Sequence, residues 1–140
     1  MDDAMGEAEL EAFLHEPNVG VLATVDAQGR PRQAPVWFRW EDGAAYLFTA
    51  PDTVKWRNLQ RDPRASLCVD RREPPYAAAL VEGTVEPADR PLHELVLAMA
   101  LAYYGEERGR AFAEAYRAGV GAVAFKLVPR RITSWSYDSY

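Results

Sequence analysis

The chain is predicted to pass from a strand into a helix within the stretch APDTVKWRNL, residues 50–59. The apolar run over residues 44–49 predicts the strand, and the proline after it ends it. The side-chain oxygen of Asp52 or Thr53 can accept a hydrogen bond from the first free backbone N–H groups of a helix. We therefore expect a short capped helix over residues 53–61, and the rest of the fold is arranged around this junction.

The start of this helix combines features that suit an anion. Its first backbone N–H groups lack intrahelical acceptors and carry a partial positive charge. Thr53 adds a hydroxyl group, and Lys55 and Arg57 add two cations within the first turns. Together these groups predict a seat for a phosphate. A capped surface helix with ordinary solvated cations has the same pattern, and these residues taken alone favour that simpler interpretation.

Apolar and alternating runs separated by short polar turns predict about six strands. They are expected at residues 19–25, 31–40, 44–49, 64–70, 76–85 and 123–128, with a loose continuation over 132–140. The first three are joined by short turns, which predicts an antiparallel meander. Helical spacing predicts further helices over residues 6–15, between Asp89 and Gly105, and over 106–118.

These elements select the fold class. A doubly wound parallel sheet is excluded because it needs a helix between most strands. We predict one mainly β (α+β) domain over residues 1–140, a small antiparallel barrel with peripheral helices.

Five positions carry local expectations. Gly83 interrupts an apolar run and predicts a bulge or a close backbone approach. Cys68 lies among apolar residues and is expected to be a buried, inert thiol. Asp89 precedes Arg-Pro and is expected to cap the following helix. Arg71 and Arg72 are expected in a turn, as part of a solvated face.

Charge and cysteine content limit the class of ligand and the compartment. The net charge is −5, so the molecule as a whole is not built to hold nucleic acid. Residues 1–16 are acidic, whereas residues 53–72 are locally basic, which suits a small anionic ligand. The single cysteine allows no intrachain disulfide and is consistent with the cytoplasm. We see no cationic leader and no apolar run of membrane-spanning length.

The sequence contains no recognisable residue-borne catalytic set. The two histidines, His15 and His93, and the one cysteine are too few and too far apart for a usual zinc site or a Ser-His-Asp triad. Neither of the common glycine-rich nucleotide motifs is present. If the protein is an enzyme, its chemistry should therefore come from a bound cofactor that the chain orients.

Five motifs follow one another along the chain: VGVLATV at 19–25, GRP at 29–31, PVWF at 35–38, DTVKWRNLQRDPRASL at 52–67 and VEGTV at 81–85. They belong to a pattern that covers about residues 8–135. Their order resembles the pyridoxamine-phosphate-oxidase-like split-barrel superfamily, and is most similar to its actinobacterial flavin and deazaflavin oxidoreductases. The Lys-x-Arg-Asn-Leu pattern followed by Arg-Asp-Pro-Arg is the most specific part of the match.

The resemblance implies a split β-barrel homodimer of the FMN-binding type, with two cofactor sites at the subunit interface. Members hold FMN or the deazaflavin coenzyme F-420 and transfer hydride to small organic acceptors. Lys55 matches the phosphate-binding lysine of the family, and Thr53 matches a nearby phosphate ligand. The acceptor pocket is expected to receive the partner's C-terminal strand, which carries Trp135 and Tyr137. The other matched cofactor-site residues are Pro35, Val36, Trp37, Phe48, Thr49, Arg57 and Asn58.

The chain also departs from the family pattern. Alanines occupy residues 77–79, where pyridoxamine phosphate oxidases often carry a glutamine, so oxidation of vitamin B6 is disfavoured. Coenzyme F-420 is the first choice and FMN the second, because the acidic tail of F-420 suits Lys55, Arg57 and Arg61. Two alternatives stay open. One is a non-catalytic protein that binds a flavin, a haem or another tetrapyrrole, and the other is a dimeric scaffold whose cleft is filled by Trp37 and Trp56.

Overall fold

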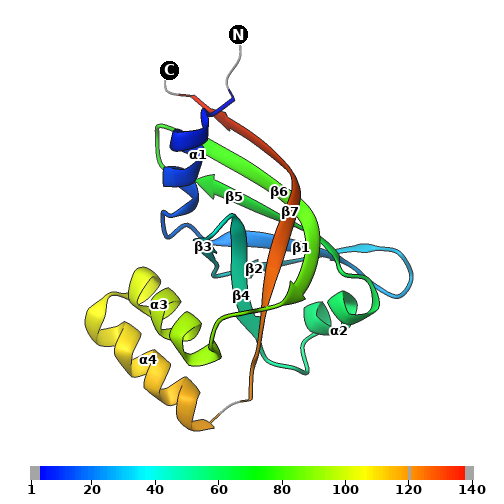
Figure 1. Cartoon of the computed structure of the whole chain (residues 1–140), viewed down its shortest axis with the longest axis vertical. Coiled ribbons are helices and arrows are strands. Elements are labelled where there is room, and N and C mark those ends of the chain that lie inside the picture. Colours follow the sequence, from blue (N-terminus) through cyan, green and yellow to red (C-terminus); the bar gives the residue numbers. More distant parts are fainter. Residues whose placement is uncertain (1–3, 120, 138–140) are drawn as a thin grey trace.

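The computed structural model describes residues 4–119 and 121–137, and its seven strands form one curled antiparallel sheet (Figure 1). This architecture confirms the predicted α+β split β-barrel. The strands lie in the order β2-β1-β5-β6-β7-β4-β3. Their bounds are β1 Gly20–Val25, β2 Pro31–Val36, β3 Arg39–Glu41, β4 Ala44–Thr49, β5 Arg64–Arg71, β6 Ala77–Pro87 and β7 Val123–Ser136.

The predicted meander keeps its antiparallel pairings, but its second strand, in which Pro31 and Pro35 indicate an edge or an irregular part, is interrupted. The strand expected over residues 31–40 breaks at Trp37 and Phe38, which is why seven strands are found instead of about six. Its first half pairs with β1 and its second half with β4, so β2 and β3 lie at opposite ends of the strand order. The break is needed because one straight strand cannot reach both edges of the sheet.

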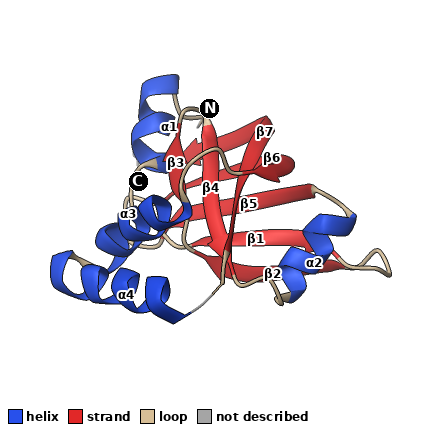
Figure 2. Ribbon diagram, turned by 60° about the horizontal axis from the view of Figure 1, so that its bottom comes forward, coloured by secondary structure: helices blue, strands red, loops and turns tan. Residues whose placement is uncertain are grey.

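Within the described residues, four helices lie outside the sheet, with α3 and α4 together as a hairpin on one side and α2 on another (Figure 2). Helix α2 is capped by Thr53, one of the two predicted candidates, because its side chain accepts a hydrogen bond from the Trp56 backbone N–H at 3.4 Å. Gly105 ends α3 with a φ of 86°, a conformation that glycine adopts without strain. The bounds are α1 Glu7–Leu14, α2 Val54–Arg61, α3 Leu92–Tyr104 and α4 Glu106–Gly119.

The prediction that Asp89 caps α3 is wrong. Pro91 occupies the cap position and makes no side-chain cap bond. The Asp89 carboxylate instead accepts a hydrogen bond of 2.7 Å from the Tyr46 hydroxyl group, and the Lys126 ammonium lies 3.4 Å from it. Burial, reinforced by this bond, raises the pKa of Tyr46 to about 12. Asp89 therefore ties the segment before α3 to β4 and β7.

The inner face of the curled sheet encloses the core, which includes Ala77, Ala79 and Val81 in the first half of β6. In β5, Ala65, Leu67 and Val69 point inward and are buried. Cys68 lies between them and faces outward, so the expectation of a buried thiol is wrong. Position in the alternation, rather than apolar neighbours, decides which way a strand residue points.

Helix α1 is held on the sheet by an ion pair that the sequence did not predict. Arg71 ends β5 rather than lying in a turn, and its guanidinium lies 2.6 Å from the Glu16 carboxylate. The same guanidinium stands 5.4 Å from the centre of the buried Phe13 ring. Arg71 thus joins the end of the helical segment to the sheet, while Arg72 is exposed as expected. In the described part of the chain, no helix is long and apolar enough to cross a membrane.

Gly83 marks the predicted irregularity. The β6–β7 register shifts between Glu82 and Gly83. A Cβ atom at Gly83 would lie 1.9 Å from the Val128 carbonyl oxygen, which belongs to the backbone and cannot rotate away.

We expect Gly83→Ala to lower the free energy of unfolding by about 1–3 kcal/mol, because the added methyl group forces β6 and β7 apart. Urea unfolding measures this change. Gly121→Ala is the matched control, since nothing lies within 4 Å of the equivalent position there. Equal stability of the two variants would contradict the close approach.

Acid is expected to destabilise the fold through carboxylates such as Glu16. Its hydrogen bond with Arg71 lowers the pKa of Glu16 from 4.5. The folded state therefore binds this proton more weakly than the unfolded chain, so the stabilisation is present above pH 4.5 and is lost as the pH falls further. Urea unfolding between pH 7 and pH 3 should show a shallower acid loss for Glu16→Gln than for Glu73→Gln, an exposed control. Identical acid profiles for the two variants would refute the contribution of Glu16.

Candidate functional site

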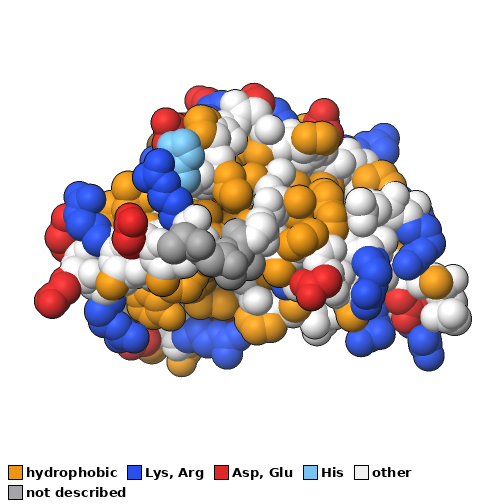
Figure 3. All heavy atoms as spheres, turned by 90° about the horizontal axis from the view of Figure 1, so that it is seen from below, with side chains coloured by type: hydrophobic (Ala, Val, Ile, Leu, Met, Phe, Trp, Pro, Cys, Tyr) orange, Lys and Arg blue, Asp and Glu red, His pale blue; other side chains and the backbone are white. Residues whose placement is uncertain are grey.

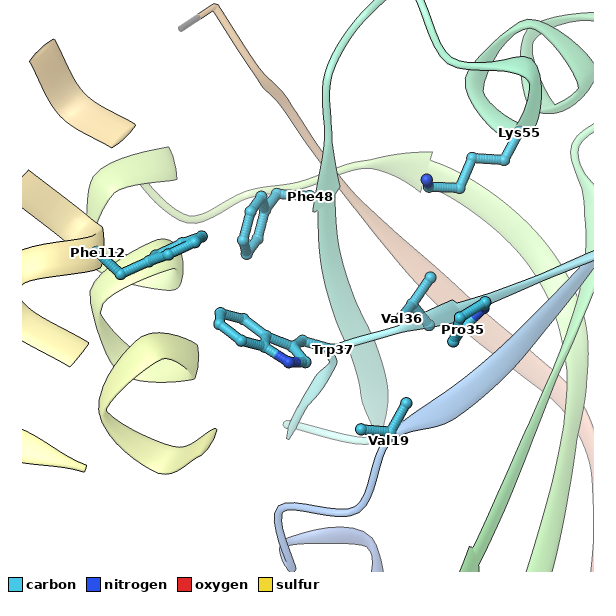
Figure 4. A pocket seen from close by; sticks show the side chains of 7 residues that line it. All are labelled: Val19, Pro35, Val36, Trp37, Phe48, Lys55 and Phe112. Carbon is cyan, nitrogen blue, oxygen red and sulfur yellow. The ribbon is translucent and has the colours of Figure 1, made fainter. Parts of the chain in front are cut away.

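A cavity of about 320 Å³ opens beside the break between β2 and β3. Figure 4 shows the Lys55 ammonium group directed into it from α2 at one end, with the Phe112 ring of α4 at the other. Five of the nine residues matched to a cofactor site meet here. The full lining is Val19, Pro35, Val36, Trp37, Phe48, Lys55 and Phe112.

An aromatic wall forms the end of the cavity away from Lys55. The Trp37 ring centre lies 6.5 Å from that of Phe48 and 5.1 Å from that of Phe112. Behind the wall, Tyr103 of α3 stacks on Trp37 with ring centres 5.1 Å apart and ring planes 3° apart. Such contacts favour one orientation of the Trp37 indole beyond the burial of its surface.

The cavity is apolar except at one end. Lys55 is the one charged residue among its lining residues. The volume lies at the lower end of the range for small-molecule sites, and one side is open: Val19 at the rim is 48% exposed. Figure 3 shows apolar side chains over the middle of the face seen from below in Figure 1, with Lys and Arg side chains and some Asp and Glu side chains at its margins. A flat apolar ligand with an anionic end matches the lining of the cavity, which is apolar apart from Lys55.

A second hollow of about 150 Å³ adjoins the first and shares Lys55. It is more polar, because Arg32 of β2 and Asn58 of α2 line it together with Thr53. The backbone N–H groups at the start of α2 belong to the turn that lacks intrahelical acceptors. This hollow therefore has the groups that bind a phosphate or carboxylate.

The Thr53 hydroxyl group is already fully bonded within the protein. It donates to the Ala50 carbonyl at 3.0 Å and accepts from the Trp56 N–H at 3.4 Å. Its third contact, at 3.0 Å, is with the hydroxyl of the buried Thr49. These bonds use the one proton and both acceptor positions of a hydroxyl group. Thr53 and Thr49 thus fix the start of α2, and with it Lys55.

Asn58 and Arg57 occupy different faces of α2. The Asn58 side chain is 2% exposed and donates to the Thr24 hydroxyl at 3.1 Å, which ties α2 to β1. The Arg61 guanidinium donates to the Asn58 side-chain oxygen at 3.4 Å. Arg57 is exposed and lines neither hollow.

Several lining residues were not predicted as site residues. Val19 was assigned to a strand and to a motif but not to the site, and Arg32 of the second hollow lies outside the quoted motifs. Phe112 belongs to a helix whose aromatic side chains were expected to contact the core or a second subunit. The helical spacing of Phe112 and Tyr116, four residues apart, was the available signal, but it does not reveal which surface they meet.

The other tryptophans lie away from the cavity. Trp56 packs on Phe125 of the core, with ring centres 5.4 Å apart, so it does not fill the cleft together with Trp37. Trp135 and Tyr137 line a separate hollow of about 500 Å³, together with Cys68 and Tyr76. In one chain these two C-terminal side chains therefore do not meet the site that Lys55 and Trp37 form.

The two joined hollows contain no paired acid and base. Among the described residues, no group of three or more His, Cys, Asp or Glu side chains is placed to hold a metal ion. The lining residues offer apolar contact surface and a cationic end that can bind and orient a ligand.

Comparisons with known proteins show the family and the fold of the chain. The family model for pyridoxamine 5'-phosphate oxidase matches residues 7–136. A pyridoxine/pyridoxamine 5'-phosphate oxidase from Burkholderia mallei is 29% identical over 155 residues, covering 95% of this chain and 72% of that protein.

Solved structures share the fold. A conserved hypothetical protein from Mycobacterium tuberculosis superposes with a TM-score of 0.81 at 27% identity, over 97% of this chain and 88% of that one. An F420 reductase gives a TM-score of 0.69 at 24% identity, covering 87% and 94%. The heme storage protein HutZ from Vibrio cholerae gives 0.68 at 21%, covering 90% and 92%. The last two likenesses concern the fold alone.

Proposed function

Because the chain belongs to the pyridoxamine 5'-phosphate oxidase family, we propose that it is a reductase that holds coenzyme F-420, or else FMN, in the cavity beside Trp37. The observation that carries the proposal is the pairing of an apolar aromatic cavity with a cationic hollow through one shared residue, Lys55. A small organic acceptor would lie over the coenzyme on the open side.

Lys55 and its surroundings would hold the anionic end of the coenzyme. The ammonium group provides a charge-assisted hydrogen bond, and the start of α2 adds backbone donors. The Thr49–Thr53 contact and the Asn58–Thr24 bond fix the helix before any ligand arrives. Less conformational freedom is then lost on binding, which favours affinity.

The apolar residues would orient the flat end of the coenzyme. Pro35, Val36 and Trp37 would line one side of the coenzyme ring, and Phe48 and Phe112 would limit how far the ring can move along that side. When bound, the reduced coenzyme supplies the hydride. The chain contributes fixed geometry and exclusion of water, and holding two reactants in contact lowers a barrier by several kcal/mol, up to roughly 7–11 kcal/mol in the most favourable cases.

The cations around the second hollow favour F-420 over FMN. Arg32 lines this hollow, and Arg61 is bonded to Asn58, another of its lining residues. FMN ends in one phosphate, whereas F-420 continues into an acidic tail that such additional cations suit. Oxidation of vitamin B6 is not proposed, because alanines 77–79 are buried within β6 and offer no polar group.

We also propose a cytoplasmic homodimer whose subunits complete each other's sites. The supporting observation is exposed apolar surface: Val19 at the cavity rim is 48% exposed, and Tyr76 and Tyr137 on the outer hollow are 52% and 37% exposed. A second copy laid against these surfaces would close the cavity and bring its own C-terminal strand near it.

A non-catalytic binding protein is the second candidate. The lack of an acid–base pair at the cavity suits storage or sensing of a flavin as well as catalysis. The cavity lining contains no histidine, cysteine or methionine, which are common axial ligands of haem iron, so a flavin fits better than a haem. Binding of reduced F-420 or FMN without oxidation by any tested acceptor would support this candidate.

We expect Lys55→Ala to weaken coenzyme binding at least tenfold, as one charge-assisted contact of about 1.5–3 kcal/mol predicts. Calorimetric titration with F-420 and FMN, side by side, measures the loss and identifies the preferred coenzyme. Arg117→Ala, which removes an exposed cation of α4 that lines neither hollow, is the matched control and should bind as the unaltered protein does. Unchanged affinity of Lys55→Ala for both coenzymes would refute the site.

The dimer is tested by light scattering at micromolar concentration. We expect a mass of twice the chain's 15.7 kDa. If the protein is instead a monomer and binds a coenzyme in calorimetric titration, one chain holds the complete site and the proposed dimer is wrong.

A further inference from the structure

We propose that Tyr103 is a positioning residue for the coenzyme site, because its hydroxyl group pins the break between β2 and β3 and its ring sets the orientation of Trp37. Tyr103 lies in α3, far along the chain from the strands that form the cavity wall. It lines neither hollow itself, so any effect on a ligand has to pass through its neighbours, of which Trp37 lines the cavity and contacts the Tyr103 ring directly.

The hydroxyl group of Tyr103 bonds to two separate backbone segments. It accepts a hydrogen bond from the Phe38 N–H at 3.2 Å. Its own proton faces the Asn18 carbonyl at 2.9 Å and the Phe38 carbonyl at 3.2 Å, and one proton is shared between these acceptors. Burial raises the pKa of Tyr103, so the phenol keeps this proton at neutral pH.

Phe38 needs such a partner because of where it lies. Residues 37 and 38 separate β2 from β3, which pair with strands at opposite ends of the sheet. The Phe38 residue is only 4% exposed, so water cannot easily replace a missing partner for its peptide groups. A buried N–H without an acceptor costs about 1–3 kcal/mol. At this break, the Tyr103 hydroxyl group provides the backbone hydrogen bonds that a neighbouring strand provides elsewhere in the sheet.

The ring of Tyr103 acts on the adjacent residue. Its plane lies 3° from that of Trp37 at a centre distance of 5.1 Å. The hydroxyl bonds hold the tyrosine ring on the Phe38 backbone, and the indole of Trp37 rests on that ring. The wall of the cavity is thereby set by α3, and the helical hairpin becomes part of the binding site without contacting the ligand through Tyr103.

The test is Tyr103→Phe, which removes the hydroxyl group and keeps the ring. Tyr104→Phe is the matched control: it is the next residue of α3, its ring centre also lies 5.0 Å from that of Trp37, and no side-chain hydrogen bond of its hydroxyl is found among the described residues. The protein is labelled with 5-fluorotryptophan, and the Trp37 signal among its four tryptophans is assigned with Trp37→Phe. Fluorine NMR spectra are recorded well below the melting temperature.

We expect Tyr103→Phe to shift or broaden the Trp37 resonance and leave the other three in place, while Tyr104→Phe changes none of them by more than a linewidth. FMN and F-420 should bind about fivefold more weakly to Tyr103→Phe, the size of one net hydrogen bond, and within twofold of normal to Tyr104→Phe. A purely structural role would lower the melting temperature without moving the Trp37 signal or the affinity, and that result would overturn the proposal.

Two further outcomes keep the test decisive. The affinity measurement rests on the proposed function, whereas the Trp37 resonance does not. If the unaltered protein binds neither coenzyme, the proposed function is rejected, and the shift of the Trp37 resonance alone then tests whether Tyr103 positions Trp37. If Tyr103→Phe does not fold, hydrogen exchange of the Phe38 amide in the unaltered protein decides. Strong protection supports the bond, and exchange at the rate of an unstructured peptide rules it out.

Discussion

The structure depends on one stretch of chain, residues 31–41, that forms strands at both ends of the sheet. Residues 31–36 pair with β1 and residues 39–41 pair with β4, while β1 and β4 are themselves kept apart by β5, β6 and β7. The two residues between these halves leave the hydrogen-bond ladder on both sides. A barrel that is split at this point has an opening where a ligand can contact the backbone and side chains of a strand end, and the candidate site lies there.

Helix α2 and the helical hairpin approach this opening from opposite sides and bring different chemistry. Helix α2 brings a cation and free backbone donors, and its position is fixed by polar bonds from Thr53 and Asn58 to β4 and β1. The hairpin brings aromatic rings. The segment that leads into the hairpin is fixed by ion pairs of Arg90 with Asp42, Glu41 and Asp89. The Tyr46 hydroxyl group also donates a hydrogen bond to Asp89 in this segment. The polarity of the cavity follows from these two attachments.

The close packing of the hairpin explains how its aromatic side chains reach the cavity. A Cβ atom at Gly109 would lie 2.6 Å from the Ala100 carbonyl oxygen, so the backbones of α3 and α4 approach more closely than any larger residue permits. This places Phe112 within 5.1 Å of Trp37 and Tyr116 within 5.2 Å of Phe48, measured between ring centres. The hairpin has its own contacts with the wall of the site and is more than a peripheral addition.

The sequence by itself determined the elements with local causes. Pro51 marked the end of a strand, and the pair Asp52 and Thr53 marked the cap of α2. Gly83 marked the bulge, and the spacing of strands and helices excluded a doubly wound parallel sheet. The motif resemblance selected nine site residues, and five of them meet in one cavity. A family motif identifies residues that lie together in the folded protein, which hydrophobic periodicity cannot do.

Only the tertiary structure decided the rest, because it depends on pairing between distant segments. The break at Trp37 follows from β2 and β3 joining opposite edges, and the outward direction of Cys68 follows from the register of β5. Arg71 and Asp89 looked like turn and cap residues until the fold placed Glu16 and Tyr46 beside them. The role of Tyr103 depends on a hydroxyl group that meets a backbone break 65 residues earlier in the chain, a contact that no local pattern contains.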